Sequence, residues 1–207
     1  MGKGLLIALE GPDGCGKSTQ IELLDSYFKN KGFDVIKTRE PGGTAISEKI
    51  RDIILDNNNC EMSDMCEALL YAAARAQLAD EVIKPALDKG KIVICDRFVY
   101  SSMVYQGLGR GLGMDIVKTI NDAALRGLDA DLVFMITIPY EEGLERKKKQ
   151  RELDRLENVG NDFHKKVFEG YSKISKSYDK IIVIDGNKKV EEVHNEIITN
   201  IEQKMEI

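Results

Sequence analysis

Residues 5–18 read LLIALEGPDGCGKS, an apolar run followed by a complete G-x-x-x-x-G-K-S element from Gly11 to Ser18. The glycines permit backbone angles that turn successive N–H groups toward a phosphate. Lys17 can reach the β- and γ-phosphates of a nucleoside triphosphate, and the Ser18 hydroxyl can ligate Mg²⁺. The helix expected after the loop adds its positive dipole end. This stretch therefore predicts a strand, a phosphate-binding loop (P-loop) and a helix.

Four further apolar runs of strand length follow along the chain. All are rich in Ile, Val and Leu and nearly continuous, a pattern typical of parallel strands covered on both faces. With the first run they are Leu5–Leu9, Asp34–Thr38, Lys91–Cys95, Asp131–Ile138 and Lys180–Ile184. Segments with helical spacing lie between or after them, at Ser18–Asn30, Met65–Leu87 and Val190–Met205. The alternation predicts an α/β protein with a doubly wound, three-layer αβα sheet of five parallel strands.

The composition excludes several classes of protein. The 207 residues, 43% of them apolar and 31% charged, suffice to bury one core without disulfides or a structural metal. A formal net charge of −5 argues against a nucleic acid as partner, because affinity for the phosphate backbone depends on clustered Lys and Arg. The four cysteines form no C-x-x-C pair, and Cys95 is expected to be a buried hydrophobic residue. Without a cleavable leader or an apolar run near the ~18 residues of a membrane span, we expect no membrane partner and a cytoplasmic location.

A P-loop defines a nucleotide site but not the reaction performed there. The guanine-reading N-K-x-D element of GTPases is absent, because Asn187-Lys188 is followed by Lys189-Val190. A single P-loop in a chain of this length also argues against a motor or helicase core. A small kinase is the economical interpretation, and it needs a second phosphate site opposite the first.

Candidates for that second site follow two of the predicted strands. Arg39 follows the second strand, and Asp96-Arg97 follows the third. Ligands of open α/β sheets bind at the carboxyl edge, where these residues would lie. Asp96 could hold Mg²⁺ directly or through water, while Arg97 could pair with a phosphate. Either arginine alone could instead be a surface salt-bridge partner, but two beside a P-loop favour the phosphate site.

Residues 145–157 interrupt the alternation of apolar strands and amphipathic helices, because they are almost wholly charged. One interpretation is a solvated helix with opposite charges at helical spacing. The other is a mobile basic lid over a polyphosphate.

Six motifs together resemble the thymidylate kinase family, within the P-loop nucleoside-monophosphate kinases, and look more like its bacterial branch than its animal branch. In chain order they are Glu10–Thr19 (EGPDGCGKST), Arg39–Thr44 (REPGGT), Tyr71–Gln77 (YAAARAQ), Asp96–Phe98 (DRF), Tyr105–Gly107 (YQG) and Glu152–Glu157 (ELDRLE). The P-loop is shared across a superfamily, whereas the combination of the second motif with DR and YQG is specific. The resemblance implies one P-loop NTPase domain over residues 1–207, with a short basic lid at about 143–160. It also implies a homodimer that transfers the γ-phosphoryl group of ATP to dTMP, with Mg²⁺, giving ADP and dTDP for dTTP synthesis.

The resemblance also assigns roles to residues. ATP would be bound by Gly11, Pro12, Asp13, Gly14, Cys15, Gly16, Lys17, Ser18 and Thr19. The residues expected to bind dTMP are Asp13, Arg39, Tyr71, Arg75, Arg97, Ser102, Tyr105 and Gln106. Ser18 and Asp96 would hold the metal, and the catalytic cations would be Lys17, Arg39, Arg97 and Arg151.

Residue chemistry is consistent with a base site around Tyr71 and Arg75. The two lie one helical turn apart and so face one side of a helix. The ring could stack on a base while the guanidinium donates to a base carbonyl, which the resemblance implies is thymine O4, although Tyr71 alone could equally be a core residue. A Tyr105 ring under the deoxyribose would disfavour a 2′-hydroxyl. Asp13 would face the sugar and the acceptor phosphate, or would simply hold the loop in an Asx turn.

The sequence departs from the family pattern at two places. Phe98 replaces the Tyr commonly found after Asp-Arg, so a hydroxyl contact is lost there. The basic positions of the lid also differ, and four residues remain candidates for its arginine finger: Arg146, Lys148, Arg151 and Arg155, with Arg151 the first choice. His164 and His194 are expected to be surface or packing residues.

Two other functions remain open at this point. The chain could be another nucleoside-monophosphate or small-metabolite kinase, which a panel of phosphoacceptors would reveal. It could also be a P-loop binding module without turnover, which would release no ADP when dTMP is added.

Overall fold

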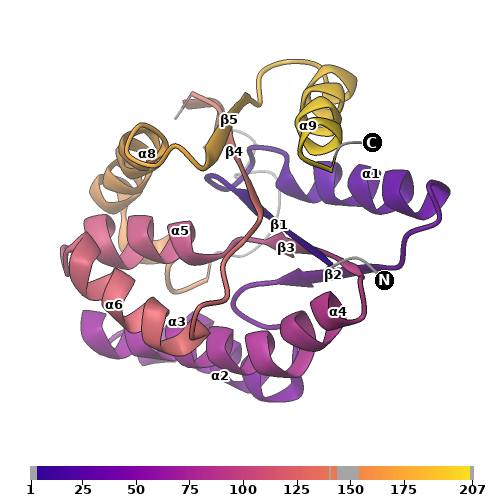
Figure 1. The fold of residues 1–207 in the computed structure, drawn as a ribbon. Helices are drawn as coiled ribbons and strands as arrows, with labels where there is room; N and C mark the ends of the chain where they lie inside the picture. The colour runs from indigo at the N-terminus through magenta and orange to yellow at the C-terminus, as the bar shows by residue number, and fades with distance from the viewer. Residues whose placement is uncertain (1–3, 140, 144–153, 206–207) are drawn as a thin grey trace.

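The structure, a computed structural model, describes residues 4–139, 141–143 and 154–205. At its centre lies a sheet of five parallel strands in the order β2-β3-β1-β4-β5 (Figure 1). The strands are β1 (Leu5–Glu10), β2 (Val35–Arg39), β3 (Ile92–Asp96), β4 (Leu132–Thr137) and β5 (Ile181–Asp185). Each predicted run matches its strand to within one residue at either end, so the α/β fold class is confirmed.

Two helices, α1 (Lys17–Asn30) and α9 (Val190–Met205), cover one face of the sheet and contact each other (Figure 1). Their apolar positions recur at threes and fours, as the sequence predicts. Those that pack on the strands are Ile21, Leu24, Phe28, Val193, Ile197 and Ile201.

The opposite face is covered by the helices of the central part of the chain and by α8. They are α2 (Ala45–Leu55), α3 (Asp64–Leu78), α4 (Lys84–Asp88), α5 (Val99–Ser102), α6 (Met114–Leu125) and α8 (Asn161–Ser175). Short 3₁₀ segments lie at η1 (Asn57–Asn59) and η4 (Glu157–Val159). The Thr44 and Ser63 hydroxyls start α2 and α3 by accepting from Ser47 N at 3.1 Å and Cys66 N at 3.3 Å.

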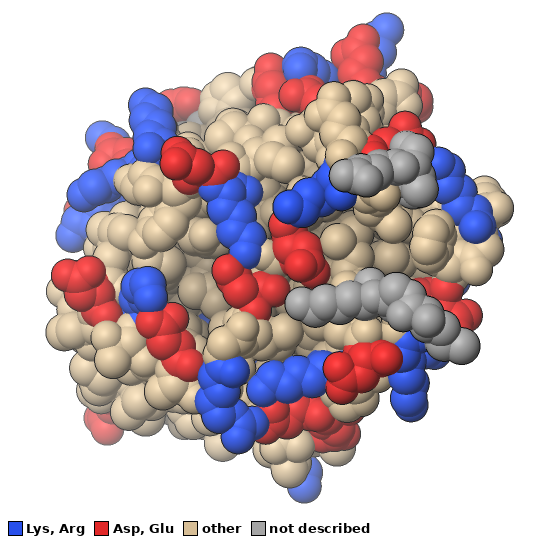
Figure 2. Space-filling view, in the orientation of Figure 1, with Lys and Arg blue, Asp and Glu red and all other residues tan. Residues whose placement is uncertain are grey.

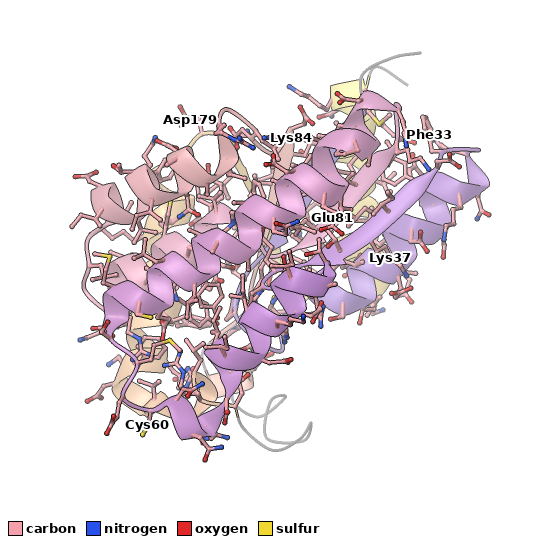
Figure 3. The ribbon with its side chains drawn as sticks, turned by 90° about the horizontal axis from the view of Figure 1, so that it is seen from below. Phe33, Lys37, Cys60, Glu81, Lys84 and Asp179 are labelled. Carbon is pink, nitrogen blue, oxygen red and sulfur yellow. The ribbon has the colours of Figure 1, made fainter. Side chains whose placement is uncertain are left out.

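The helix predicted over Met65–Leu87 is a continuous helical run but not a uniform one. A π-helical segment, η2 (Ala79–Ile83), separates α3 from α4. Pro85 lies just beyond it and has no N–H to donate to the carbonyl four residues earlier, which disturbs the α-helical ladder there. Figure 3 shows this run beside α2, with Glu81 and Lys84 along it and Cys60 at the turn between α2 and α3. A second π-helical segment, η3 (Met103–Gly109), carries Tyr105 and Gln106.

The strand ends bring the predicted functional residues to one edge of the sheet. Asp96, the last residue of β3, lies opposite Leu9 of β1 on one side and Arg39 of β2 on the other. Cys95 is fully buried, as expected. Within the described part of the chain, no helix has both the length and the apolar character needed to cross a membrane.

Candidate active site

The P-loop joins β1 to α1 at the carboxyl edge of the sheet, as predicted. Gly11 and Gly16 adopt φ values of 137° and 100°, which residues with side chains rarely tolerate. A Cβ at Gly11 would also collide with the carbonyl oxygen of Ile136. Lys17 Nζ donates to Gly11 O at 2.9 Å and to Pro12 O at 3.0 Å, so the ammonium group lies folded over the loop.

Arg97 connects the P-loop to the opposite side of the site. It follows β3 with a φ of 68°. Its Nη1 donates to Gly11 O at 3.0 Å and to the Tyr171 hydroxyl at 2.7 Å, while Nη2 donates to Asp13 Oδ1 at 2.5 Å. The guanidinium is therefore fixed between the P-loop and α8.

A buried carboxylate, Glu10, supports this arrangement from beneath. It accepts hydrogen bonds from Phe98 N at 2.9 Å, Ser101 N at 3.2 Å and Ser101 Oγ at 2.5 Å. Ser101 Oγ in turn lies 2.9 Å from the Tyr171 hydroxyl and accepts from Arg97 Nη1 at 3.1 Å. Burial raises the pKa of Glu10, against the hydrogen bond from Ser101 and the charge of Arg97, which lower it. This carboxylate thus fixes the start of α5 and, through Ser101, the Arg97 guanidinium.

A cavity opens beside Arg97, with walls formed by α2, α3 and η3. Seven of the eight residues predicted to bind dTMP line it, namely Asp13, Tyr71, Arg75, Arg97, Ser102, Tyr105 and Gln106. Arg39 is the eighth and does not line the cavity. Sequence reasoning missed Glu40 and Arg51 as lining residues, and it expected His164 on the surface or in packing, whereas His164 lines the cavity too.

The Arg75 side chain in the cavity wall is bound by four protein groups. Glu40 Oε2 lies 2.6 Å from its Nε and 2.5 Å from its Nη2, and both side chains are almost fully buried. Nη1 donates to Ser102 Oγ at 3.0 Å and to Asn121 Oδ1, and Nη2 donates to Phe98 O at 3.0 Å. The guanidinium thus donates four hydrogen bonds to protein acceptors, and Nη2 also lies within ion-pair distance of Glu40.

Two tyrosines give the cavity aromatic walls. The Arg97 guanidinium carbon lies 5.4 Å from the centroid of the Tyr105 ring, within cation–π range. Tyr71 lines the cavity one turn before Arg75 and also packs against the hydrophobic core. Burial raises the pKa of Tyr71. Tyr71 therefore packs against the hydrophobic core and also lines the cavity. The two interpretations that the sequence offered for this residue are compatible.

Arg39 lies on the surface beside the cavity rather than in its wall. Its Nη1 and Nη2 donate to the two carboxylate oxygens of Glu48 at 2.7 and 2.9 Å, and its side chain is 47% exposed. Arg39 thus takes part in a surface salt bridge, which is the alternative to a phosphate site that the sequence left open for it. Arg51 does line the cavity, where it donates to Pro41 O at 2.9 Å. Burial, followed by the positive charge of Arg39, lowers the pKa of Arg51, so an anion between the two guanidinium groups would relieve their repulsion.

The predicted metal ligands have the chemistry that Mg²⁺ prefers. Asp96 Oδ1 is buried and has no hydrogen-bond partner among the described residues. The Ser18 side chain is exposed at the start of α1. Carboxylate and hydroxyl oxygens suit this ion, which commonly takes one or two protein oxygens together with phosphates and water. The two residues fit Mg²⁺, although no group of three or more His, Cys, Asp or Glu that could hold a metal occurs among residues 4–139, 141–143 and 154–205.

Three of the four lid candidates, Arg146, Lys148 and Arg151, lie outside the described residues. The fourth, Arg155, is buried: its Nε donates to Ile54 O and its Nη2 to Glu67 Oε2, both at 2.7 Å. These two acceptors hold Arg155 against α2 and α3, and it does not line the cavity.

Charges of both signs are interspersed on the face of the molecule shown in Figure 2. A mixed surface of this kind produces no strong field of one sign. Binding of an anionic substrate therefore depends on the local cations of the cavity and the P-loop.

Comparisons with known proteins agree with this geometry. The thymidylate kinase family model matches residues 9–197. The chain is 53% identical to the thymidylate kinase of Geobacillus sp. (strain WCH70) over 194 residues, which cover 92% of each chain. It is 51% identical to that of Thermoanaerobacter sp. (strain X514) over 197 residues (95% of this chain, 96% of the relative) and 48% identical to that of Finegoldia magna over 194 residues (94% and 96%). With a P-loop and an arginine-lined cavity at one sheet edge, and a family match across nearly its whole length, the chain belongs to the thymidylate kinase family.

Proposed function

We propose that the P-loop binds ATP and that the cavity binds dTMP, so that the γ-phosphoryl group passes between them beside Arg97. The chain is a kinase that forms dTDP and ADP from dTMP and ATP, a step toward dTTP. The observation that carries the site assignment is the position of Arg97, whose guanidinium contacts Gly11 of the P-loop and also lines the cavity. A cation in that position can neutralise charge on both the donor and the acceptor phosphates.

The chemistry requires positioning and positive charge rather than a strong base. The attacking phosphate oxygen of dTMP is already anionic, so catalysis rests on in-line placement and electrostatic stabilisation. Lys17 exchanges the carbonyl oxygens of Gly11 and Pro12 for phosphate oxygens when ATP binds. Ser18 and Asp96 are the residues that would hold Mg²⁺, and the ion would supply positive charge beside the phosphates of ATP.

The cavity supplies contacts to each part of the acceptor. Arg51 and Arg97 are the cations for the dTMP phosphate, with Arg39 beside them once it leaves Glu48. The Tyr105 ring lies next to Arg97 and suits the sugar. Tyr71, Arg75 and Gln106 line the cavity from α3 and η3 and are the residues that we assign to the base.

The reaction is tested by following ADP release with a panel of monophosphates. We expect dTMP to be the preferred acceptor, with dUMP, dCMP, dAMP, dGMP and AMP weaker. Preference for AMP, CMP or a non-nucleotide acceptor would assign the chain another kinase activity. Nucleotide binding without ADP release on addition of dTMP would make it a binding module.

A lid at about residues 143–160 of a single kinase domain completes the proposal. The variable P-loop positions 12–15 contain no arginine, so a closing cation must come from elsewhere. Arg151 remains our candidate, because Arg155 is bound to Glu67. Comparing kcat for single alanine variants at Arg146, Lys148, Arg151 and Arg155 tests it, and unchanged kcat in all four would contradict the lid.

We further propose that the chain forms a homodimer through α2, α3 and α6. Among the described residues eight large apolar side chains are exposed, and five of them lie on these three neighbouring helices: Ile46, Ile53, Met65, Leu69 and Ile116. Apolar side chains gathered on adjacent helices indicate an interface. A cytoplasmic location accords with four cysteines that are all free thiols.

We expect Leu69→Glu to convert the dimer into a monomer, because a charge at the centre of an apolar interface is costly to bury. Leu69 is 50% exposed on α3. Val190→Glu is the matched control, since Val190 is 45% exposed but lies on α9, away from these helices. Sedimentation velocity measures the outcome, and a wild-type monomer, or a dimer in both variants, would contradict the assignment.

A further inference from the structure

The side of α3 that faces the cavity carries a third polar residue besides Tyr71 and Arg75. Glu67 lies one helical turn before Tyr71 and is only 1% exposed. It accepts from Gln106 Nε2 at 3.0 Å, from Arg110 Nη2 at 2.8 Å and from Arg155 Nη2 at 2.7 Å. A buried carboxylate with two arginine partners is a demanding arrangement to maintain, and the proposed reaction does not use it directly.

Gln106 shows a complementary feature. Its side chain is 1% exposed and lines the cavity, yet its Oε1 has no hydrogen-bond partner among the described residues. An unpaired buried amide oxygen costs free energy unless a ligand supplies a donor.

The charge of Glu67 determines which end of the Gln106 amide meets the ligand. Burial raises the pKa of Glu67, but hydrogen bonds from Arg110, Gln106 and Arg155 outweigh it, and the net pKa is lowered. An ionised carboxylate only accepts hydrogen bonds, so the Gln106 amide must turn its Nε2 toward Glu67. The Gln106 Oε1 is then turned away from Glu67 and is left to accept a hydrogen bond from a ligand.

We propose that Glu67 is a positioning residue for base selectivity, which acts by locking the Gln106 amide with its oxygen toward the base. This inference rests on the proposed dTMP site. Thymine and uracil present an N3–H donor to such an oxygen, whereas cytosine presents an N3 lone pair and is repelled. A site built around a fixed acceptor rejects the wrong base more strongly than apolar packing alone would.

The test compares dTMP with 5-methyl-dCMP, which keeps the 5-methyl group but reverses the hydrogen-bonding pattern at N3 and C4. The measured quantity is the ratio of kcat/KM for the two acceptors. Glu67→Gln replaces the carboxylate by a neutral amide of the same shape that can donate as well as accept, which frees Gln106 to turn over. We expect this ratio to fall at least about tenfold, because the variant loses the discrimination that roughly one neutral hydrogen bond provides.

Arg110→Gln is the matched control. It removes one arginine from Glu67 but leaves the contact between Glu67 and Gln106 in place, so stability should fall while the ratio stays at the wild-type value. If Glu67→Gln gives no cooperative thermal transition, Glu67→Asp replaces it. The shorter side chain keeps a negative charge for the two arginines, whose own side chains are long and flexible, but lengthens its contact with Gln106.

The outcomes separate this inference from the base site itself. A lowered ratio in the Glu67 variant, with an unchanged ratio in Arg110→Gln, supports the positioning role. Equal losses of kcat/KM for both acceptors would show Glu67 to be purely structural and would overturn it. A wild-type enzyme that uses 5-methyl-dCMP as well as dTMP would instead overturn the proposed base site.

Discussion

Lys17→Ala is expected to reduce phosphoryl transfer from ATP to dTMP by about 10²- to 10³-fold, the range measured for the loss of a single group that stabilises transition-state charge. Lys17 follows the P-loop glycines, and its ammonium lies over the carbonyls of Gly11 and Pro12, at the place where phosphates bind. The P-loop contains no second lysine that could take its place. Single-turnover measurement of dTDP formation at saturating substrates gives the loss directly.

The Lys17 variant is expected to fold normally. The ammonium group donates to two carbonyl oxygens and, at 3.7 Å, to the Cys15 sulfur, so its removal leaves no opposite charge unpaired. Lys29→Ala is the control on the same helix, because its ammonium is exposed and its partner Asp25 keeps a second cation, Lys37, at 3.5 Å. Near-normal turnover in Lys17→Ala with an unchanged melting temperature would refute the assignment of the P-loop.

The fold was predictable because its determinants are local in sequence. Five nearly continuous apolar runs set the strands, and the P-loop glycines set the turn between β1 and α1. The π-helical segment at Ala79–Ile83 was not predicted, since the apolar period continues through it and only Pro85 signals an irregularity. The strand order was also not predicted, because short apolar runs carry no information about their neighbours.

The site was predictable where strand ends place residues and unpredictable where distant side chains meet. The position of Arg97 at the edge of the sheet follows from β3, but its contact with Tyr171 joins residues 74 positions apart. Glu40 pairs with Arg75 across 35 positions. Arg39 leaves β2 as expected, and Glu48 in the first turn of α2 then captures its guanidinium. Such pairings depend on how helices pack, which residue types and spacing do not encode.

Arg75→Ala is expected to destabilise the protein by about 3–5 kcal/mol, the usual cost of leaving a buried charge without its partner. Arg75 is the main partner of Glu40, and three further acceptors, Ser102 Oγ, Asn121 Oδ1 and Phe98 O, lose their donor at the same time. If the guanidinium also donates to the base, as the sequence predicts, losing that one charged hydrogen bond lowers dTMP affinity by about one to two powers of ten. The buried ion pair adds a loss of stability that sequence could not reveal. Denaturant unfolding of the wild type and the variant measures it.

The destabilisation should also depend on pH, with a sign that follows from Glu40. Burial raises the pKa of Glu40 to about 7, while the charge of Arg75 lowers it and that of Glu10 raises it. Without Arg75 the pKa of Glu40 rises further. In the folded variant, Glu40 therefore stays protonated up to a higher pH than in the wild type. A folded state that binds more protons than the unfolded state loses stability as pH rises, by about 1.4 kcal/mol per unit for one proton. The stability gap between wild type and Arg75→Ala should therefore widen above about pH 7.

Two further variants separate the ion pair from substrate recognition. Adding Glu40→Gln to Arg75→Ala removes the buried acid, so the pH-dependent widening should disappear. Arg75→Lys keeps a positive charge beside Glu40 but loses the planar fork that reaches Ser102 and Asn121 together. It should retain more stability than Arg75→Ala, while KM for dTMP rises and KM for ATP changes little. Equal increases in both KM values would show that Arg75 serves the fold alone, because a residue that recognises only the acceptor cannot weaken the donor site to the same extent.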